Sequence, residues 1–142
     1  MDTNTLAKNS KSPFDFAKKY TKRLHEIFED ITENEINGLV KILLDARKNG
    51  NTIFTAGNGG SATTASSMGN DLGFDILKKT GTKVPFRFHP LTDNIPSITA
   101  ISNDSNYNFI FLEQLKLHYR DNDLLILISA SGNAQNLIEC AN

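Results

Sequence analysis

The stretch that decides the fold is TIFTAGNGGS, residues 52–61. Residues 52–56 are short, apolar and β-branched, as in a buried strand, and they run directly into glycine, asparagine and serine. A helix rich in alanine, serine and threonine follows, to about Gly73. The same design recurs where LLILI, residues 124–128, runs into SASGN, residues 129–133. Strands that alternate with helices predict an α/β fold, in which a parallel sheet is covered by helices on both faces.

The region before residue 52 reads as helical. Ser12 followed by Pro13 is a start signal, and apolar residues then recur at spacings of three and four as far as residue 31. A second helix opens near residues 32–33 and ends at Gly50. We expect these two helices to form a helical hairpin. Residues 1–11 are polar and without periodicity, which predicts a flexible N-terminal arm.

The other elements follow from the same signals, and Pro90 marks its strand as an edge strand because proline cannot donate to a ladder. In chain order we expect a loose stretch at 74–84, an edge strand at 86–91, a short helix at 94–104, a helix at 107–119, a turn at 121–123, a fully buried strand at 124–128 and a last helix that begins after residue 133.

The composition of the chain limits the classes of function that it can have. The chain has 142 residues with 15 basic and 16 acidic side chains, which fits one domain and provides no basic surface for nucleic acid or an anionic membrane. It shows no transmembrane run and no signal peptide, so we expect a cytoplasmic protein. Cys140 is the only cysteine, which excludes an internal disulfide. Three strands make a thin sheet, so we expect either another subunit to complete it or residues 12–142 to be a C-terminally incomplete domain.

The two glycine- and serine-containing loops predict an anion site. Glycines let the backbone approach an anion closely, amide groups at the start of a helix point toward it, and serine hydroxyls donate without adding charge. Such loops at the carboxyl ends of adjacent parallel strands lie where open α/β sheets bind ligands. Neither loop has a dinucleotide or P-loop fingerprint, and no lysine follows closely, so a phosphomonoester fits better than a triphosphate. The alternative is that each loop is only a tight strand-to-helix turn.

Four segments together resemble the sugar isomerase (SIS) domain, and within it the D-sedoheptulose 7-phosphate isomerases: GNGGSA (57–62), LTD (91–93), AISND (100–104) and ISASGN (128–133). The resemblance implies a flavodoxin-like parallel sheet and a homotetramer with active sites shared between subunits. It also implies that a sugar phosphate is contacted by Asn58, Gly59, Gly60, Ser61, Asn103, Asp104, Ser129 and Ser131.

The chain departs from that family in ways that bear on catalysis. The family places a zinc-binding His and, four residues later, a Glu on the helix after the first loop, where this chain has Ser67 and Asp71. The family's other zinc ligands would lie beyond residue 142, so no zinc site is expected from these residues. Asp71 is the candidate catalytic base, with a solvated or capping aspartate as the alternative. His89 is a second candidate base, with an ordinary edge-strand histidine as the alternative. Ala130 and Ala134 replace hydroxyl-bearing residues of the family's phosphate loop.

Three functions remain open at this point. The first is isomerisation of sedoheptulose 7-phosphate to a heptose 7-phosphate that supplies surface-polysaccharide precursors. The second is a non-catalytic SIS protein that acts as a sensor or scaffold, of the kind that associates with a replication initiator. The third is a zinc-independent isomerase of another sugar phosphate, with Asp71 as the base.

Overall fold

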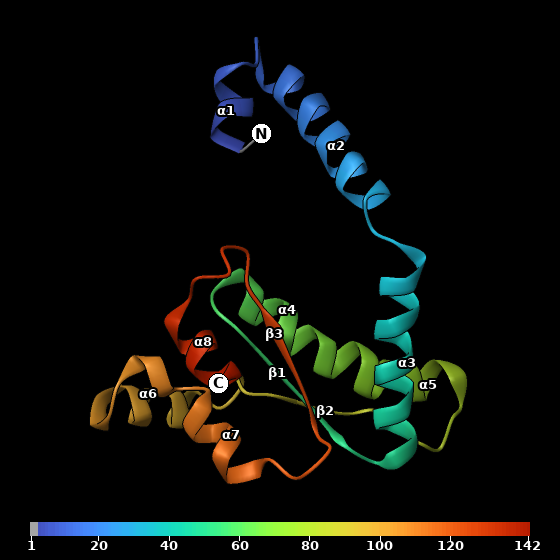
Figure 1. The fold of residues 1–142 in the computed structure, drawn as a ribbon, viewed down its shortest axis with the longest axis vertical. Coiled ribbons are helices and arrows are strands. Elements are labelled where there is room, and N and C mark those ends of the chain that lie inside the picture. Colours follow the sequence, from blue (N-terminus) through green and yellow to red (C-terminus); the bar gives the residue numbers. More distant parts are fainter. Residues whose placement is uncertain (1–2) are drawn as a thin grey trace. The chain divides into compact units, whose positions relative to one another are not determined.

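The computed structural model describes residues 3–142 of the chain, which forms two compact units, residues 1–42 and 43–142. The elements are α1 (Thr3–Lys8), α2 (Pro13–Glu29), α3 (Glu33–Asn49), β1 (Thr52–Gly57), α4 (Gly60–Met68), a π-helical segment η1 (Gly69–Asp75), α5 (Ile76–Thr80), β2 (Arg87–Pro90), α6 (Ile95–Asp104), a 3-10 turn η2 (Tyr107–Phe109), α7 (Leu112–His118), β3 (Leu124–Ile128) and α8 (Gln135–Ala141) (Figure 1).

The first two long helices begin where the sequence predicts, because each has a side-chain cap. The Ser12 hydroxyl accepts a hydrogen bond from the Asp15 amide at 3.1 Å, and Pro13 occupies the first turn of α2. At the start of α3, the Thr32 amide donates to the Glu35 carboxylate at 2.8 Å, and the Glu35 amide donates back to the Thr32 hydroxyl at 3.3 Å. The Thr32 hydroxyl also donates to the Glu35 carboxylate, at 2.7 Å, and the two hydrogen bonds that this carboxylate accepts from Thr32 lower the pKa of Glu35.

Part of the expected arm is helical. Within residues 1–11, for which the sequence predicts a flexible arm, α1 occupies Thr3–Lys8; residues 1 and 2 lie outside the described residues. The segment after α1 is held by hydrogen bonds to α2, which apolar periodicity cannot predict. The Lys19 ammonium donates to the Asn9 carbonyl at 2.7 Å, and the Lys11 amide donates to the Asp15 carboxylate at 2.8 Å. The Lys19 ammonium also donates to the Asp15 carboxylate, at 2.8 Å. The hydrogen bonds from Lys19 and from the Lys11 amide lower the pKa of Asp15.

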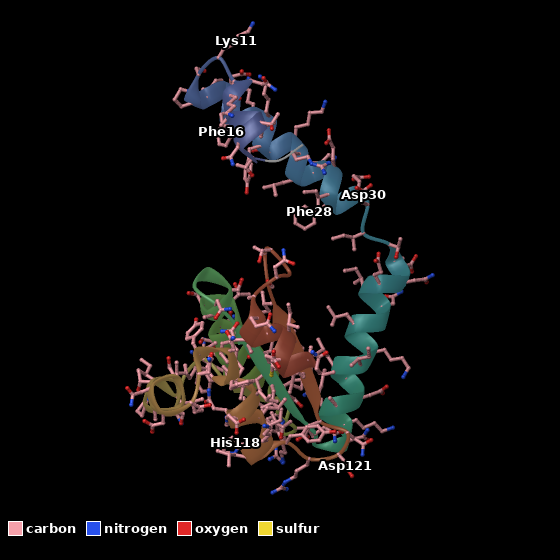
Figure 2. The ribbon with its side chains drawn as sticks, turned by 60° about the vertical axis from the view of Figure 1, so that its left-hand side comes forward. Lys11, Phe16, Phe28, Asp30, His118 and Asp121 are labelled. Atoms are coloured by element: carbon pink, nitrogen blue, oxygen red, sulfur yellow. The ribbon has the colours of Figure 1, made fainter. Side chains whose placement is uncertain are left out.

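Both predicted N-terminal helices, α2 and α3, form at the expected positions. Many of their apolar side chains are exposed. Phe28, which projects from the end of α2 in Figure 2, is 68% exposed. The other exposed large apolar residues of this region of the chain are Phe14, Tyr20, Leu24, Ile27, Ile31, Ile36, Leu39, Val40, Ile42 and Leu44.

The sheet is parallel, as predicted, with the order β2-β1-β3. Phe54 of central β1 is in register with His89 of β2 and Leu125 of β3. β2 is an edge strand and Pro90 lies opposite Thr55 at its end, as the missing proline amide requires. The expectation that 124–128 is fully buried is wrong: all five residues are half-buried, because β3 pairs only with β1 among the described strands.

Helices cover both faces of the sheet, which confirms the three-layer α/β prediction. On one face, the Thr55 hydroxyl donates to the Ala65 carbonyl of α4 at 3.1 Å, and both residues are fully buried. On the other face, α6, η2, α7 and α8 enclose the main core, where buried Gln114 donates to the Leu91 carbonyl at 3.0 Å. That core contains Phe54, Ala56, Leu91, Ile110, Phe111, Leu137 and Cys140.

Two helical boundaries differ from the prediction. The helix after the first loop does not end near Gly73 but continues through η1 into α5, so part of the expected loose stretch is helical. η1 begins at Gly69, where a Cβ atom would lie 2.8 Å from the Pro90 ring, so the helix passes closer to β2 than a larger residue allows. The expected helix at 107–119 is divided into η2 and α7.

A short turn ties the starts of two strands together. The Asp123 carboxylate accepts hydrogen bonds from the Thr52 amide at 2.7 Å and the Arg120 amide at 3.0 Å. Asn122 adopts a left-handed conformation with φ of 71° beside it. The predicted turn at 121–123 therefore also fixes β3 against β1. No helix within residues 3–142 has the length and apolar character that a membrane span requires.

Candidate functional site

The two predicted loops meet at the carboxyl edge of the sheet, as parallel pairing of β1 and β3 requires (Figure 1). They enclose a pocket of about 200 Å³. Its lining residues come from the first loop, the second loop and the start of α8: Asn58, Ser61, Ile128, Ser129, Ala130, Ser131, Ala134 and Leu137. The structure therefore brings four of the predicted site residues, Asn58, Ser61, Ser129 and Ser131, together around one pocket.

Glycine is required at two positions of the first loop. A Cβ atom on Gly57 would lie 2.7 Å from the carbonyl carbon and oxygen of Ser61, so only glycine lets the end of β1 approach α4 this closely. Gly59 has φ of 53° and ψ of −121°, a conformation that side chains disfavour. Gly60 then opens α4, and the amides of Ser61, Ala62 and Thr63 donate to the carbonyls of Asn58 and Gly59 at 3.0–3.2 Å. The loop backbone is therefore held in shape by its own hydrogen bonds.

The second loop is shaped by its own serines. The Ser129 hydroxyl accepts from the Gly132 amide at 3.0 Å, and the Ser131 hydroxyl accepts from the Asn133 amide at 3.3 Å. Each hydroxyl keeps its proton, which is available to donate to a bound oxygen. Both serines are exposed to solvent. The loop can therefore supply neutral donors from its side chains while keeping its shape.

An amide pair joins the two loops, and sequence reasoning did not identify it. Asn58 Nδ2 donates to Asn136 Oδ1 at 2.8 Å, and Asn136 Nδ2 donates to Asn58 Oδ1 at 2.9 Å. The Tyr107 hydroxyl also donates to Asn58 Oδ1, at 3.1 Å. Asn136 lies in α8 and is 2% exposed. The only sequence signal is a polar residue within the first turn of the helix that follows the second loop.

Asn103 and Asp104, which the resemblance implies as contacts, lie at the end of α6 and do not line this pocket. Both are exposed, and Asn103 Nδ2 donates to Asp104 Oδ1 at 2.7 Å. The same chain segment continues to Tyr107, which does reach the first loop. The segment that follows Asn103 and Asp104 therefore contacts the first loop through the Tyr107 hydroxyl.

Asp71, the candidate base, lies in η1 and is exposed, with its carboxylate accepting from Asn70 Nδ2 at 2.9 Å. It does not line the pocket between the loops. Ser67 is an exposed residue of α4, so a change from α to π geometry separates the two positions.

The side chains at these positions do not fit the zinc site that the resemblance implies. Ser67 offers a neutral hydroxyl, a poor zinc ligand beside His, Cys or a carboxylate. Across residues 3–142, no three His, Cys, Asp or Glu side chains converge in a way that could hold a metal ion. We therefore derive no chemical step through zinc.

His89 lies in a different pocket, of about 550 Å³, beside the edge strand β2. Its ring is 5.4 Å from the Phe54 ring and 5.1 Å from the ring of His118, which ends α7 (Figure 2). Partial burial lowers the pKa of His89, and the nearby His118 lowers it further, while Asp93 acts in the opposite direction. His89 does not line the pocket between the loops.

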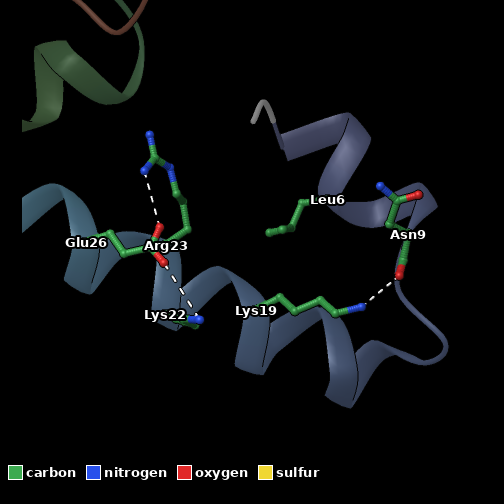
Figure 3. A pocket seen from close by; sticks show the side chains of 6 residues that line it. All are labelled: Leu6, Asn9, Lys19, Lys22, Arg23 and Glu26. Carbon is green, nitrogen blue, oxygen red and sulfur yellow. Dashed lines mark hydrogen bonds and ion pairs between the residues drawn. The ribbon is translucent and has the colours of Figure 1, made fainter.

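A further pocket of about 310 Å³ lies between α1 and α2 (Figure 3). It is lined by Leu6, Asn9, Lys19, Lys22, Arg23 and Glu26. Its three cations share two carboxylates: Lys19 pairs with Asp15 at 2.8 Å, while Arg23 and Lys22 both pair with Glu26, at 3.3 Å and 4.0 Å. One positive charge in this group is therefore not compensated.

The fold and the two loops together define an α/β domain with a small pocket, lined by serine and asparagine side chains, at the carboxyl edge of its parallel sheet. The SIS domain family profile matches residues 15–142. The probable phosphoheptose isomerase of Thermoplasma acidophilum is 33% identical over 123 residues, covering 87% of this chain and 66% of that protein. The phosphoheptose isomerase of Aliarcobacter butzleri is 40% identical over 102 residues, covering 69% and 50%.

Solved structures agree with this result. Phosphoheptose isomerase GmhA from Neisseria gonorrhoeae superposes with a TM-score of 0.74 at 28% identity, over 88% of this chain and 64% of that one. A phosphoheptose isomerase from Francisella tularensis shares the fold, with a TM-score of 0.77 at 22% identity over 91% and 66%. The chain belongs to the SIS domain family. It spans about half to two thirds of the length of these relatives.

Proposed function

We propose that this chain is the phosphosugar-binding part of an aldose–ketose isomerase that converts sedoheptulose 7-phosphate to a heptose 7-phosphate. The observation that carries the proposal is the pocket shared by the two loops, in a chain whose relatives are named phosphoheptose isomerases. The expected cellular role is to supply surface-polysaccharide precursors in the cytoplasm.

The chemistry of the pocket favours a phosphomonoester. Its polar side chains are the hydroxyls of three serines and the amide of Asn58, and no lysine or arginine lines it. Neutral donors hold a dianion without the counter-charge that a triphosphate requires. Ala130 and Ala134 contribute no hydroxyl, so binding rests on fewer donors than a serine-rich loop would supply.

In the proposed reaction a base removes a proton from C1 of the ketose, and the released electron pair forms the C1=C2 bond of an enediol as O2 gains a proton. The O1 proton then leaves while C2 gains a proton, which produces the aldehyde at C1. The step needs a group of suitable pKa beside C1 and C2. Asp71 is the proposed base on this chain, and phosphate held between the loops would fix the other end of the substrate.

Proton NMR of sedoheptulose 7-phosphate with the chain in heavy water tests this proposal. Heptose phosphate should form and deuterium should enter at C1 or C2, and both should be lost in Asp71→Asn. Asp75→Asn is the matched control, because Asp75 lies in the same helical segment and pairs with Lys79 at 3.1 Å. Absence of both signals from folded protein would overturn catalysis by this chain.

A second function is a non-catalytic phosphosugar sensor or scaffold. The observation that favours it is the position of Asp71, which is exposed, hydrogen-bonded to Asn70 and away from the residues that line the pocket. In the same NMR experiment this function predicts selective broadening of the substrate resonances without isomer formation. A zinc-independent isomerase of another sugar phosphate would instead show turnover that is insensitive to a chelator.

We also propose that the chain assembles with copies of itself, as the resemblance to tetrameric SIS proteins implies. The support is the set of exposed apolar side chains on α2 and α3, which water-exposed monomeric helices rarely carry in such number. Sedimentation velocity should give a mass near four chains, and a mass of one chain at micromolar concentration would contradict the proposal.

A further inference from the structure

We propose that Asn136 is a positioning residue that holds the two phosphate loops at a fixed separation through its amide pair with Asn58, and that the Tyr107 hydroxyl completes this clamp. The inference rests on the proposed phosphate site and adds to it residues that contact the loops rather than the ligand. The two asparagines are 78 positions apart in sequence, so their pairing is a tertiary contact.

The geometry of the pair is that of a closed two-way hydrogen bond. Each side-chain amide donates to the oxygen of the other, at 2.8 Å and 2.9 Å. Asn136 is 2% exposed, so an unpaired donor or acceptor there would lack water to replace its partner. Breaking the pair therefore costs more than the loss of an exposed hydrogen bond.

The position of the pair determines what it controls. Asn58 belongs to the first loop and lines the pocket, whereas Asn136 is the second residue of α8, directly after the second loop. Ala134, two residues before Asn136, lines the same pocket. The pair therefore joins the two walls of the pocket, and a change in its length changes the distance between the donors on opposite walls.

Hydrogen-bond capacity assigns Asn58 a different role from the one that the resemblance implies. Asn58 Oδ1 accepts from both Asn136 and Tyr107, which uses the two lone pairs of a carbonyl oxygen. Asn58 Nδ2 donates one of its two protons to Asn136. The side chain thus has one proton left for a ligand, and its main contribution is to hold the loop in place.

The test uses the full chain, inorganic phosphate as the probe, and isothermal titration at several pH values. Asn136→Asp replaces the inward donor with a carboxylate oxygen that faces Asn58 Oδ1, while Gln135→Glu adds the same charge at the exposed neighbouring residue. At pH 8, Asn136→Asp should bind phosphate about tenfold more weakly than Gln135→Glu, since a lost hydrogen bond and a repulsive contact act together. The deficit should shrink toward pH 5, because a protonated carboxyl can donate as the amide did.

Two further readouts keep the inference separate from the proposed function. Tyr107→Phe removes one exposed hydroxyl, should fold whatever the fate of Asn136→Asp, and should weaken phosphate binding about threefold. Without ligand, Asn136→Asp should shift the backbone amide NMR signals of Gly59 and Gly60. Wild-type protein that does not bind phosphate would overturn the proposed function. Unchanged first-loop signals, or a folded Asn136→Asp protein that binds phosphate as well as Gln135→Glu, would overturn the clamp.

Discussion

Replacing Gly57 by alanine tests the close approach on which the first loop depends. The added Cβ would lie 2.7 Å from the carbonyl carbon and oxygen of Ser61, whereas ordinary contacts begin at 3.4 Å, so the end of β1 and the start of α4 must separate by 3.4 − 2.7 = 0.7 Å. The obstructing atoms are backbone, so no side-chain rotation relieves the clash. Overpacking of this kind costs about 1–3 kcal/mol of unfolding free energy.

Urea unfolding followed by circular dichroism measures that cost. With a slope of about 2 kcal/mol per molar urea, a 2 kcal/mol loss lowers the midpoint by about 1 M, and phosphate affinity should fall in the same variant. Gly38→Ala is the control: it lies in α3 with nothing within 4 Å of an added Cβ, so alanine should raise stability by about 1 kcal/mol or less. A Gly57→Ala protein with the midpoint and phosphate affinity of wild type would refute the close approach.

Three other perturbations have expected outcomes. Burial raises the pKa of the Cys140 thiol to about 11. At pH 8 this thiol should therefore react with a thiol reagent about a hundredfold more slowly in the native chain than in the urea-unfolded chain. Equal rates would contradict its burial. The pKa of His89 lies below its ordinary value, so protonation of this group favours the unfolded chain and stability falls as the pH drops through about 6.5. His118→Gln should raise the pKa of His89 in an imidazole NMR titration. An unchanged pKa would show that His118 is not a cause of the shift. Asp123→Ala removes two backbone hydrogen bonds and should lower stability by about 1–3 kcal/mol in the same urea assay, more than Asp123→Asn, which keeps one acceptor oxygen; equal losses would show that the carboxylate is dispensable.

Local chemistry was enough to predict much of this fold. The apolar run at 124–128 predicts both ends of β3, and the cap at Ser12 predicts the start of α2. The meeting of the two loops followed from topology alone, because parallel strands place their carboxyl ends at one edge. These features depend on a few neighbouring residues or on a general rule of sheet geometry.

The missed features depend on contacts between segments distant in sequence. The π-helical segment begins where Gly69 packs against Pro90, and no local pattern in residues 60–80 specifies that neighbour. The pairing of Asn58 with Asn136 depends on the directions of two side chains on separate elements. The exposure of the α2 and α3 faces could not be read from periodicity either, because an amphipathic pattern shows that a face is apolar and not what covers it.

The position of β3 has a consequence for how this chain meets other polypeptides. Its five apolar residues carry no charge, proline or bulge, and among the described residues nothing pairs with the edge that faces away from β1. An open row of amides and carbonyls beside such a sequence is a template on which another extended segment can add as a fourth strand. Association through this edge would be backbone-directed and tolerant of sequence, in contrast to the side-chain contacts that the apolar faces of α2 and α3 would make.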